Sequence, residues 1–218
     1  MSLKSYTKYK VGGCVRDKIL GIESTDIDYV VVSDMSLSNL EAELTEIGYK
    51  IFVTIPERNT IRCKMTGSKQ IFDFILTNDL KDDVLRRDFT MNCLLEDEHG
   101  KIIDFVGGLQ DIESKLIKCP ISPNITISND PIRIFRAFRF AIKFNFRIDL
   151  ELWNAIRTFA VEEFENIRID KMVEEMQKMF RLDTMKSIDY FHRLKHLNEP
   201  LYEYIFKRVW LRANLIKK

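Results

Sequence analysis

Two aspartates separated by one residue open an apolar run early in the chain. Asp26 and Asp28 begin the segment Asp26-Ile27-Asp28-Tyr29-Val30-Val31-Val32, which has the composition of a strand. Side chains two apart in a strand leave the same face, so both carboxylates point the same way. Close like charges repel unless a cation lies between them, and Mg²⁺ prefers oxygen ligands that it shares with phosphates. The pair indicates a Mg²⁺ site for phosphate chemistry, with two solvated acids as the alternative.

A third acid interrupts another apolar run, Ile71-Phe72-Asp73-Phe74-Ile75-Leu76. An unpaired carboxylate in such a run is costly to bury. If the two runs are neighbouring strands, Asp73 completes a three-carboxylate site with Asp26 and Asp28. Such an arrangement holds two metal ions for phosphoryl transfer.

A glycine turn precedes the paired acids. The segment Val11-Gly12-Gly13-Cys14-Val15-Arg16 predicts a turn that opens a short helix, which ends near Gly21. Glycines allow a ligand to approach the main chain, unpaired N–H groups at a helix start can face a phosphate, and Arg16 adds charge. An ordinary strand-to-helix turn is the alternative for this segment taken alone.

Two later segments concentrate arginine. Residues 86–92, Arg-Arg-Asp-Phe-Thr-Met-Asn, place two cations, an acid and an amide before a predicted strand, with a solvated loop as the alternative. Residues 129–140 predict a helix with Asp130 as N-cap and Pro131 at its first position. Its three arginines span an arc of about 120°, a face suited either to phosphates and bases or to surface salt bridges. They are Arg133, Arg136 and Arg139.

The elements that position these residues fall into two regions. Short β-rich runs alternate with helices in the first half and predict one mixed sheet with helices packed on it. These runs are residues 27–32, 50–55, 60–65, 71–76, 93–96 and 102–105. From Asp130 the pattern is helical almost to Lys218, with no further strand signal. We expect an α+β fold with one domain over 1–119 and a helical domain over 120–218.

Composition restricts the function classes. Of 218 residues, 45% are hydrophobic and 31% charged, as in a soluble folded protein. A net charge of +1 argues against holding nucleic acid by bulk electrostatics, although residues 186–218 are locally basic. No apolar run approaches the ~20 residues that span a membrane, and no signal peptide is visible. We therefore expect a cytoplasmic protein with no membrane contact.

One histidine pair stands apart from these motifs. His192 and His196 are one helical turn apart, a spacing that permits joint metal binding. The sequence places no third ligand nearby, so two surface residues of a helix are the preferred interpretation.

Four segments in order resemble the motifs of the class II tRNA nucleotidyltransferase and poly(A) polymerase family. They are GGCVRDKILGIESTDIDYVV, LRRDFTMNCLL, DFVGGLQDI and NDPIRIFRAFRFA, and the resemblance spans about Lys10 to Phe180. It implies a polymerase-β-like nucleotidyltransferase head followed by an all-helical neck and body. It also implies attack of an RNA 3′-hydroxyl on the α-phosphorus of a nucleotide, without a template and with release of pyrophosphate.

The resemblance implies a role for each site residue. The three carboxylates of Asp26, Asp28 and Asp73 would be catalytic and would hold two Mg²⁺ ions. Contacts to the incoming nucleotide would come from Gly12, Gly13, Arg16, Arg87, Asp88 and Asn92. Asp130 and Arg133 would read the base edge of CTP or ATP, with Arg136 in support. GTP and UTP would leave buried groups unpaired and be rejected.

One departure from the family bears on the product. Only nine residues, Thr77 to Leu85, separate the third-carboxylate strand from the Arg-Arg-Asp-Phe-Thr motif. In this family a shortened loop is associated with enzymes that add C but not the terminal A. CC addition to tRNA is therefore favoured, with a separate A-adding enzyme as partner. Full CCA addition, a poly(A)-type or A-adding polymerase, and a non-catalytic nucleotide sensor or RNA-binding module are the alternatives.

Other departures concern base selection and RNA binding. Asn129 stands where Glu is usual, and Asp170-Lys171 where Glu-Arg is usual. Only 38 residues follow Phe180, fewer than the family's body and tail require. Either the chain forms a homodimer, or the RNA is smaller, or a basic C-terminal segment binds RNA phosphates. The basic residues proposed for this contact are Lys207, Arg208 and Arg212.

Overall fold

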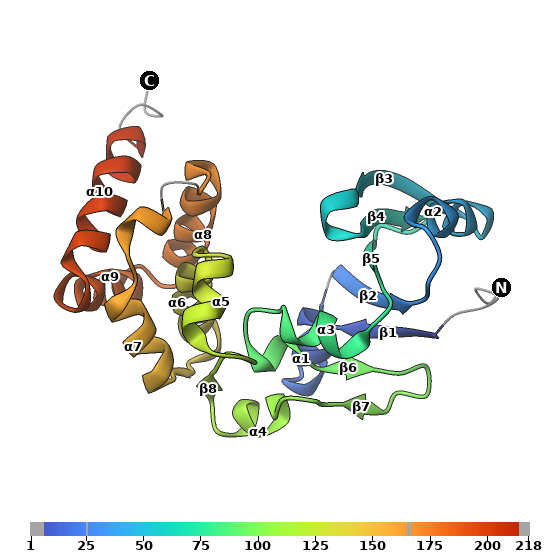
Figure 1. The fold of residues 1–218 in the computed structure, drawn as a ribbon, viewed down its shortest axis with the longest axis horizontal. Coiled ribbons are helices and arrows are strands. Elements are labelled where there is room, and N and C mark those ends of the chain that lie inside the picture. The colour runs from blue at the N-terminus through green and yellow to red at the C-terminus, as the bar shows by residue number, and fades with distance from the viewer. Residues whose placement is uncertain (1–6, 25, 165–166, 214–218) are drawn as a thin grey trace. The chain divides into compact units, whose positions relative to one another are not determined.

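The computed structural model describes residues 7–24, 26–164 and 167–213, with side chains up to residue 208. The chain divides into two compact units, Met1–Leu109 and Gln110–Lys218. The first combines a sheet with helices and the second is mostly helical, so the predicted α+β fold class is confirmed (Figure 1). The domain boundary expected between residues 119 and 120 stays a prediction.

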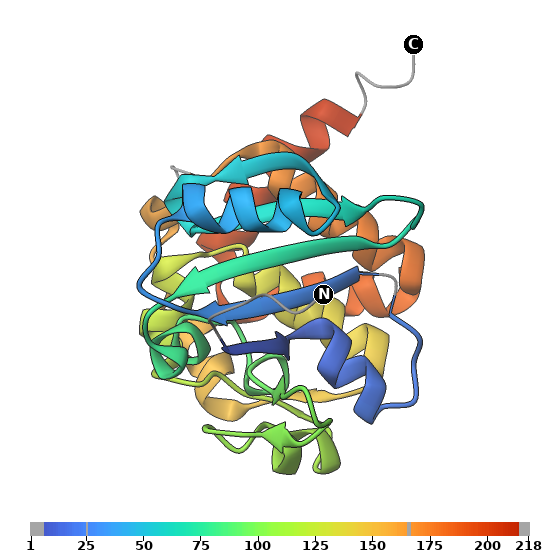
Figure 2. The same cartoon turned by 90° about the vertical axis from the view of Figure 1, so that its right-hand side faces the viewer.

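A seven-stranded sheet forms the centre of the first unit, with the strand order β3-β4-β5-β2-β1-β6-β7. Its strands are β1 Thr7–Val11, β2 Asp26–Val32, β3 Tyr49–Ile55, β4 Thr60–Met65, β5 Ile71–Thr77, β6 Leu95–Glu96 and β7 Ile102–Ile103. The central strands β2 and β5 run in the same direction, and every other neighbouring pair is antiparallel (Figure 2). The sequence analysis missed β1, whose Thr-Lys-Tyr-Lys-Val alternation is short and carries two lysines.

Helices cover both faces of this sheet. They are α1 Gly13–Ile19, α2 Leu37–Glu46 and α3 Leu80–Leu85, with 3₁₀ turns at Pro56–Arg58 and Thr90–Asn92. Helix α4, Gly108–Glu113, spans the boundary between the two units. On one face Leu40 and Leu44 of α2 pack against Val31 of β2. On the other face Val84 of α3 packs against Val30. Because successive strand residues point to opposite faces, adjacent valines of β2 serve two separate cores.

The second unit is helical apart from one short strand pair. Its elements are α5 Pro123–Asn129, α6 Arg133–Phe144, α7 Leu150–Thr158, the 3₁₀ turn Val161–Phe164, α8 Ile169–Leu182, α9 Thr184–Leu197, α10 Glu199–Ala213, β8 Leu116–Ile117 and β9 Arg147–Ile148. Phe135 of α6 lies at the centre of its core, with its ring against those of Phe164 and Phe191. None of the helices within the described ranges is long and apolar enough to cross a membrane.

Two expectations for this unit are wrong in detail. β9 lies beyond Asp130, where no strand was expected, because a two-residue strand is too short to show a period of two. Helix α6 begins at Arg133 rather than at Pro131, since Pro131 and Ile132 form a turn. The Asp130 carboxylate still accepts a hydrogen bond from the Ile132 N–H at 3.2 Å, so it caps this turn.

The segment Asp104-Phe105-Val106-Gly107-Gly108 folds around the Asp104 carboxylate. Its Oδ1 accepts hydrogen bonds from the N–H groups of Val106, Gly107 and Gly108 at 2.9–3.1 Å, and its Oδ2 accepts one from Leu109 at 2.9 Å. The turn brings Gly108 against the Thr90 main chain. A Cβ at Gly108 would lie 2.3 Å from the Thr90 carbonyl oxygen, so only glycine fits there.

Replacing Gly108 by Ala is therefore expected to lower the free energy of unfolding by about 3 kcal/mol, since main chain rather than a flexible side chain must move. Urea unfolding followed by far-ultraviolet circular dichroism measures the change. Gly100→Ala is the control, because its Cβ meets open space and only its positive φ of 80° causes strain. Equal losses in both variants would contradict the close packing of Gly108 on Thr90.

Candidate active site

The paired acids and the third acid lie on neighbouring strands. In the parallel register of β2 and β5, Asp28 is the partner of Asp73, and Asp26 is the partner of Ile71. Aligned residues of adjacent strands point to the same face, so the three carboxylates share one face near the starts of both strands. The expected adjacency of these strands is confirmed.

The pKa of Asp28 is raised above its ordinary value. Its pKa is raised to about 6, mainly by burial and then by the nearby charges of Asp73 and Asp26, while the Arg87 and Arg62 guanidinium groups oppose the rise. A carboxyl that resists ionisation for these reasons is buried and lies close to other negative charges. Such a group gains from a cation, and its oxygens are the ligands that Mg²⁺ prefers.

Asp73 has a partner that the sequence analysis missed. Arg62 of β4 lies opposite Asp73 in the antiparallel register with β5. Its Nε donates to Asp73 Oδ1 at 2.7 Å and its Nη2 to Oδ2 at 2.6 Å. Within the described part of the chain, no group of three or more His, Cys, Asp or Glu side chains is arranged to hold a metal ion. A metal-binding role for Asp26, Asp28 and Asp73 together therefore stays a prediction.

The glycine turn lies beside these carboxylates. Val11, the last residue of β1, pairs with Asp28, and Gly12 follows it with φ 77° and ψ −131°, a backbone conformation open to glycine. A Cβ at Gly12 would lie 3.2 Å from Arg87 Nη1 and 3.7 Å from Asp28 Oδ2. The lack of a side chain thus allows an arginine and a carboxylate to meet over the main chain. Gly13 begins helix α1.

A buried polar network joins the glycine turn to the second arginine segment. Arg16 Nε and Nη2 donate to Asp17 Oδ1 at 2.8 and 2.6 Å, and Arg16 Nη1 donates to Asn92 Oδ1. Asn92 Nδ2 in turn donates to Asp88 Oδ1 at 2.8 Å. All four side chains are at least 90% buried. Arg16, Asp88 and Asn92 therefore fix two sequence-distant motifs against each other, and their contacts with a nucleotide stay predictions.

Arg87 is oriented by an acid that the sequence analysis also missed. Asp83 is only 2% exposed, and its Oδ2 accepts hydrogen bonds from Arg87 Nε and Nη2 at 2.9 and 2.6 Å. Its Oδ1 accepts two from Arg86, at 3.0 and 2.6 Å. Because Nε and Nη2 of Arg87 are bound to Asp83, the remaining Nη1 of Arg87 faces Gly12. The four-residue spacing of Asp83 and Arg87, at which opposite charges can pair over one helical turn, is the signal that could have revealed the pair.

The residues expected to read the base lie in the second unit. Asp130 precedes α6, and Arg133 in its first turn donates from Nη1 to the Thr126 carbonyl of α5 at 3.1 Å. The Arg136 guanidinium lies 5.4 Å from the centre of the Phe140 ring. These residues lie along one short stretch of chain, and their joint action with the first unit stays a prediction.

Arg139 has a structural role. Its Nε donates to Glu175 Oε2 of α8 at 2.6 Å, and both side chains are largely buried. The three arginines of α6 therefore do not form one exposed cationic face, because one of them ties α6 to α8.

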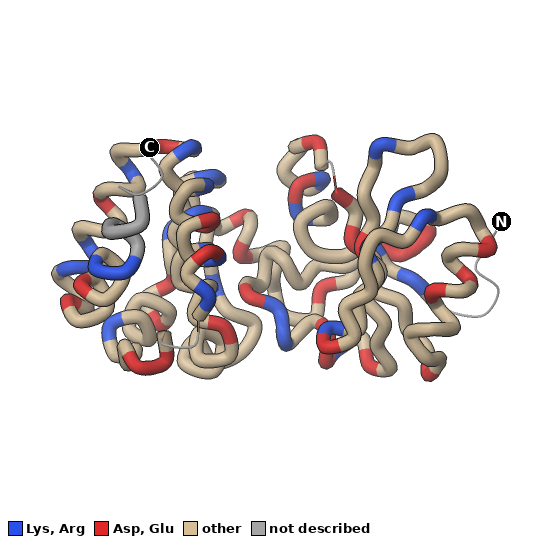
Figure 3. The backbone as a smooth tube through the Cα atoms, turned by 90° about the horizontal axis from the view of Figure 1, so that it is seen from above, with Lys and Arg blue, Asp and Glu red and all other residues tan. Residues whose placement is uncertain are grey.

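The basic residues proposed for RNA binding lie on α10. Lys207 pairs with Glu203 at 3.8 Å, and the Arg208 guanidinium lies 4.4 Å from the centre of the Tyr204 ring. The side chain of Arg212 lies outside the described residues. Basic and acidic positions are interspersed along both units (Figure 3).

The raised pKa of Asp28 makes the stability of the metal-free protein depend on pH. The folded state keeps this proton to about pH 6, whereas the unfolded chain loses it near pH 3.8. Between these values folding is coupled to proton uptake, so the Asp28 contribution to the free energy of unfolding falls as pH rises, by up to about 3 kcal/mol.

Asn cannot ionise, so Asp28→Asn is expected to gain stability relative to the wild type as pH rises from 4 to 7. Urea unfolding of both proteins in EDTA at several pH values measures this difference. Ionisable groups remote from Asp28 contribute equally to the unfolding free energies of both proteins, so their contributions cancel in the difference. A difference that stays constant with pH would contradict the buried, crowded environment assigned to Asp28.

The chain is similar to known proteins in sequence and in fold. The model of the poly(A) polymerase head domain matches residues 8–118. A multifunctional CCA protein of Pseudomonas paraeruginosa is 35% identical over 164 residues, which are 70% of this chain and 39% of that protein.

Two solved structures are similar over most of the chain. The Thermotoga maritima CCA-adding enzyme complexed with tRNA superimposes with a TM-score of 0.75 at 27% identity, covering 93% of this chain and 48% of that one. A CCA-adding enzyme in complex with CTP superimposes with a TM-score of 0.75 at 29% identity, covering 88% and 47%. The chain thus spans less than half the length of each of these proteins.

Proposed function

Since the chain belongs to the poly(A) polymerase head domain family, which the class II CCA-adding enzymes share, we propose that it adds C residues to tRNA 3′ ends. The substrates would be CTP and an RNA 3′-hydroxyl, and the products an extended RNA and pyrophosphate. The observation that carries this proposal is the register pairing of Asp28 with Asp73 beside the Gly12 turn. This register supports a shared site for the three carboxylates beside the main chain at Gly12, which no side chain covers.

The carboxylates fit the metal that this chemistry requires. Asp26, Asp28 and Asp73 offer hard oxygen ligands, and the raised pKa of Asp28 reflects first its burial and then the nearby negative charges of Asp73 and Asp26. These three residues would hold Mg²⁺, which when bound supplies the charge neutralisation that phosphoryl transfer needs. Asp73 would have to share its oxygens between Arg62 and the ion.

The remaining site residues position the nucleotide. Arg87 Nη1, held over Gly12 by Asp83, is placed to pair with a phosphate oxygen. Asp130 and Arg133 offer an acceptor and a donor that complement one base edge, so a mismatched base would form fewer hydrogen bonds with them. Gly13, Arg16, Asp88, Asn92 and Arg136 would support these contacts.

The connection between β5 and α3 favours CC over CCA addition. Only Asn78 and Asp79 separate the two elements. The Asp79 side chain caps α3 by accepting hydrogen bonds from the N–H groups of Lys81 and Asp82, at 2.7 and 3.3 Å. The family's longer loop at this place is thus replaced by a capped turn. We propose that a separate enzyme adds the terminal A.

RNA binding is proposed for α10. Lys207, Arg208 and Arg212 would contact RNA phosphates, which makes affinity fall steeply with salt. Alternatively, a homodimer would enlarge the protein surface available for RNA binding. A cytoplasmic location stays a prediction.

An extension assay tests the proposed function. A tRNA transcript that ends at its discriminator base is incubated with Mg²⁺ and each labelled nucleotide alone, and then with CTP plus ATP. We expect two added C residues, no incorporation of G or U, and no A on a tRNA that already ends in CC. A complete CCA end would contradict the CC assignment, long A tails would favour a poly(A)-type polymerase, and no incorporation would favour a non-catalytic module.

A further inference from the structure

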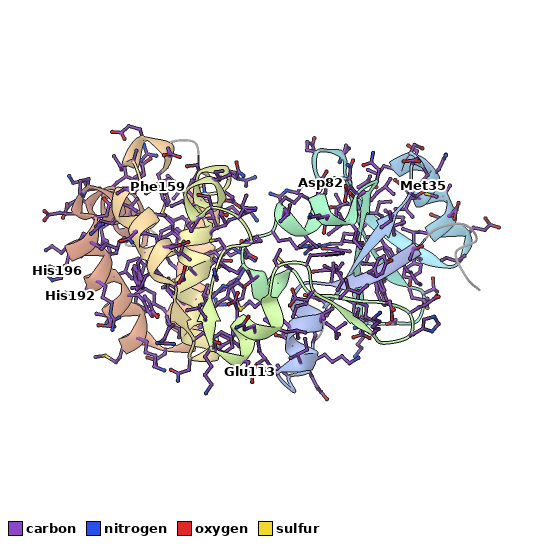
Figure 4. The ribbon with its side chains drawn as sticks, turned by 60° about the horizontal axis from the view of Figure 1, so that its bottom comes forward. Met35, Asp82, Glu113, Phe159, His192 and His196 are labelled. Atoms are coloured by element: carbon purple, nitrogen blue, oxygen red, sulfur yellow. The ribbon has the colours of Figure 1, made fainter. Side chains whose placement is uncertain are left out.

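We propose that His192 and His196 form a chelating site for a divalent transition-metal ion such as Zn²⁺, Ni²⁺ or Cu²⁺. The pair lies on α9 of the second unit and takes no part in the proposed nucleotidyl transfer. Both rings project into solvent from the same side of the helix (Figure 4). Its ligands would be imidazole nitrogens, whereas those of the proposed Mg²⁺ site are carboxylate oxygens.

The spacing of the two ring nitrogens fits one ion. His192 Nε2 and His196 Nε2 are 3.3 Å apart. Two bonds of about 2.0–2.1 Å from Zn²⁺ to imidazole nitrogen, at a tetrahedral angle, place the nitrogens about 3.3–3.4 Å apart. The rings therefore already have the separation that a shared ion needs, and little rearrangement would accompany binding.

Packing of the buried side of helix α9 fixes the positions of the two imidazole rings on its exposed side. Phe191 and Leu194, which alternate with the histidines along the helix, are 3% and 0% exposed. The Phe191 ring packs against Phe180 of α8 and Phe206 of α10. Residues four apart on a helix differ by about 40° in direction, so the same packing that anchors α9 keeps both imidazoles together.

A hydrogen bond between the two rings accounts for the same distance in the metal-free protein. It requires one Nε2 to carry a proton and the other to accept it. An ion takes the place of that proton, which moves to Nδ1 of the same ring, so binding needs no net loss of a proton from two neutral imidazoles. Metal binding at the pair thus requires only a change of tautomer in one ring.

The neighbouring charges define what kind of site this is. Asp189, one turn before His192, pairs with Arg193 at 2.8 Å, and the Lys195 ammonium lies over the Tyr202 ring. In the ranges that the structure covers, no third His, Cys, Asp or Glu joins the pair in a metal-binding group. Water would complete the coordination, so affinity should follow the order Co²⁺ below Ni²⁺ below Cu²⁺, and Mg²⁺ should not compete.

Calorimetric titration of the untagged full chain with Ni²⁺, in excess Mg²⁺, tests the proposal. We expect one ion per chain and a loss of affinity of about tenfold or more in either His192→Ala or His196→Ala, because a single ligand loses the chelate effect. The chain contains only three histidines. His99→Ala is the matched control, since His99 is exposed and lies in the β6–β7 turn, and its affinity should equal that of the wild type.

Equal affinity in the wild type, His192→Ala and His196→Ala would overturn the proposal, as would loss of affinity in His99→Ala alone. Circular dichroism of each variant should match that of the wild type, since both replaced side chains are exposed. Because the measurement uses no nucleotide or RNA, its result is independent of whether the chain extends tRNA.

Discussion

Replacement of Asp28 by Asn is expected to reduce nucleotide addition by at least about a thousandfold, because it removes a group that would act directly at the reacting atoms. Asn keeps the size of the side chain but removes the negative charge that a cation needs. Asp28 is central among the three acids, as its partner in register is Asp73 and its pKa responds to both neighbours. Single-turnover extension of tRNA with CTP measures the loss.

Asp34→Asn is the matched control for this experiment. Asp34 is an exposed acid just beyond the opposite end of β2, so its replacement should leave extension within about twofold of the wild type. Urea unfolding must show that Asp28→Asn is folded. Activity of folded Asp28→Asn close to that of Asp34→Asn would remove Asp28 from the reaction centre.

Replacement of Asp83 by Ala is expected to lower the free energy of unfolding by about 3–5 kcal/mol. Asp83 accepts four hydrogen bonds from Arg86 and Arg87, and the Arg87 side chain is only 15% exposed. Removal of the acid leaves a largely buried guanidinium without its counter-charge, which is the costly way to break a buried ion pair. Urea unfolding at neutral pH measures the change.

Asp82→Ala is the control, since Asp82 is the adjacent, exposed acid of the same helix (Figure 4). It should lose no more than about 1 kcal/mol through its interaction with the start of α3. Asp83→Ala should also weaken CTP binding, because Arg87 loses the two hydrogen bonds to Asp83 that hold its Nη1 over Gly12. Similar unfolding free energies for the two variants would contradict the buried ion pair of Asp83 with Arg87.

Local patterns predicted the central strands well. The acid pair, its alternation along β2 and the apolar run around Asp73 are short-range features, and both strands formed as expected. Spacing also predicted the turn at Gly12 and the helix after it. These features are encoded within about ten residues, so no knowledge of the tertiary fold is needed to recognise them.

Partners that come from other strands and helices could not be predicted in the same way. The contact of Arg62 with Asp73 depends on the register between β4 and β5, and that of Arg16 with Asn92 joins residues 76 positions apart. The strand β9 was missed because two residues show no periodicity. The tight fit of Gly108 depends on the Thr90 main chain, which the sequence around Gly108 does not reveal.

The most direct test of the central claim is whether these 218 residues alone transfer CMP to RNA. The wild-type chain is incubated with tRNA lacking its CCA end, labelled CTP and Mg²⁺, and both RNA-bound label and released pyrophosphate are quantified over time. We predict one pyrophosphate for each CMP added, a stop after two additions, and complete inhibition by EDTA. CTP binding without either product would contradict the claim and leave a nucleotide-binding module without catalysis.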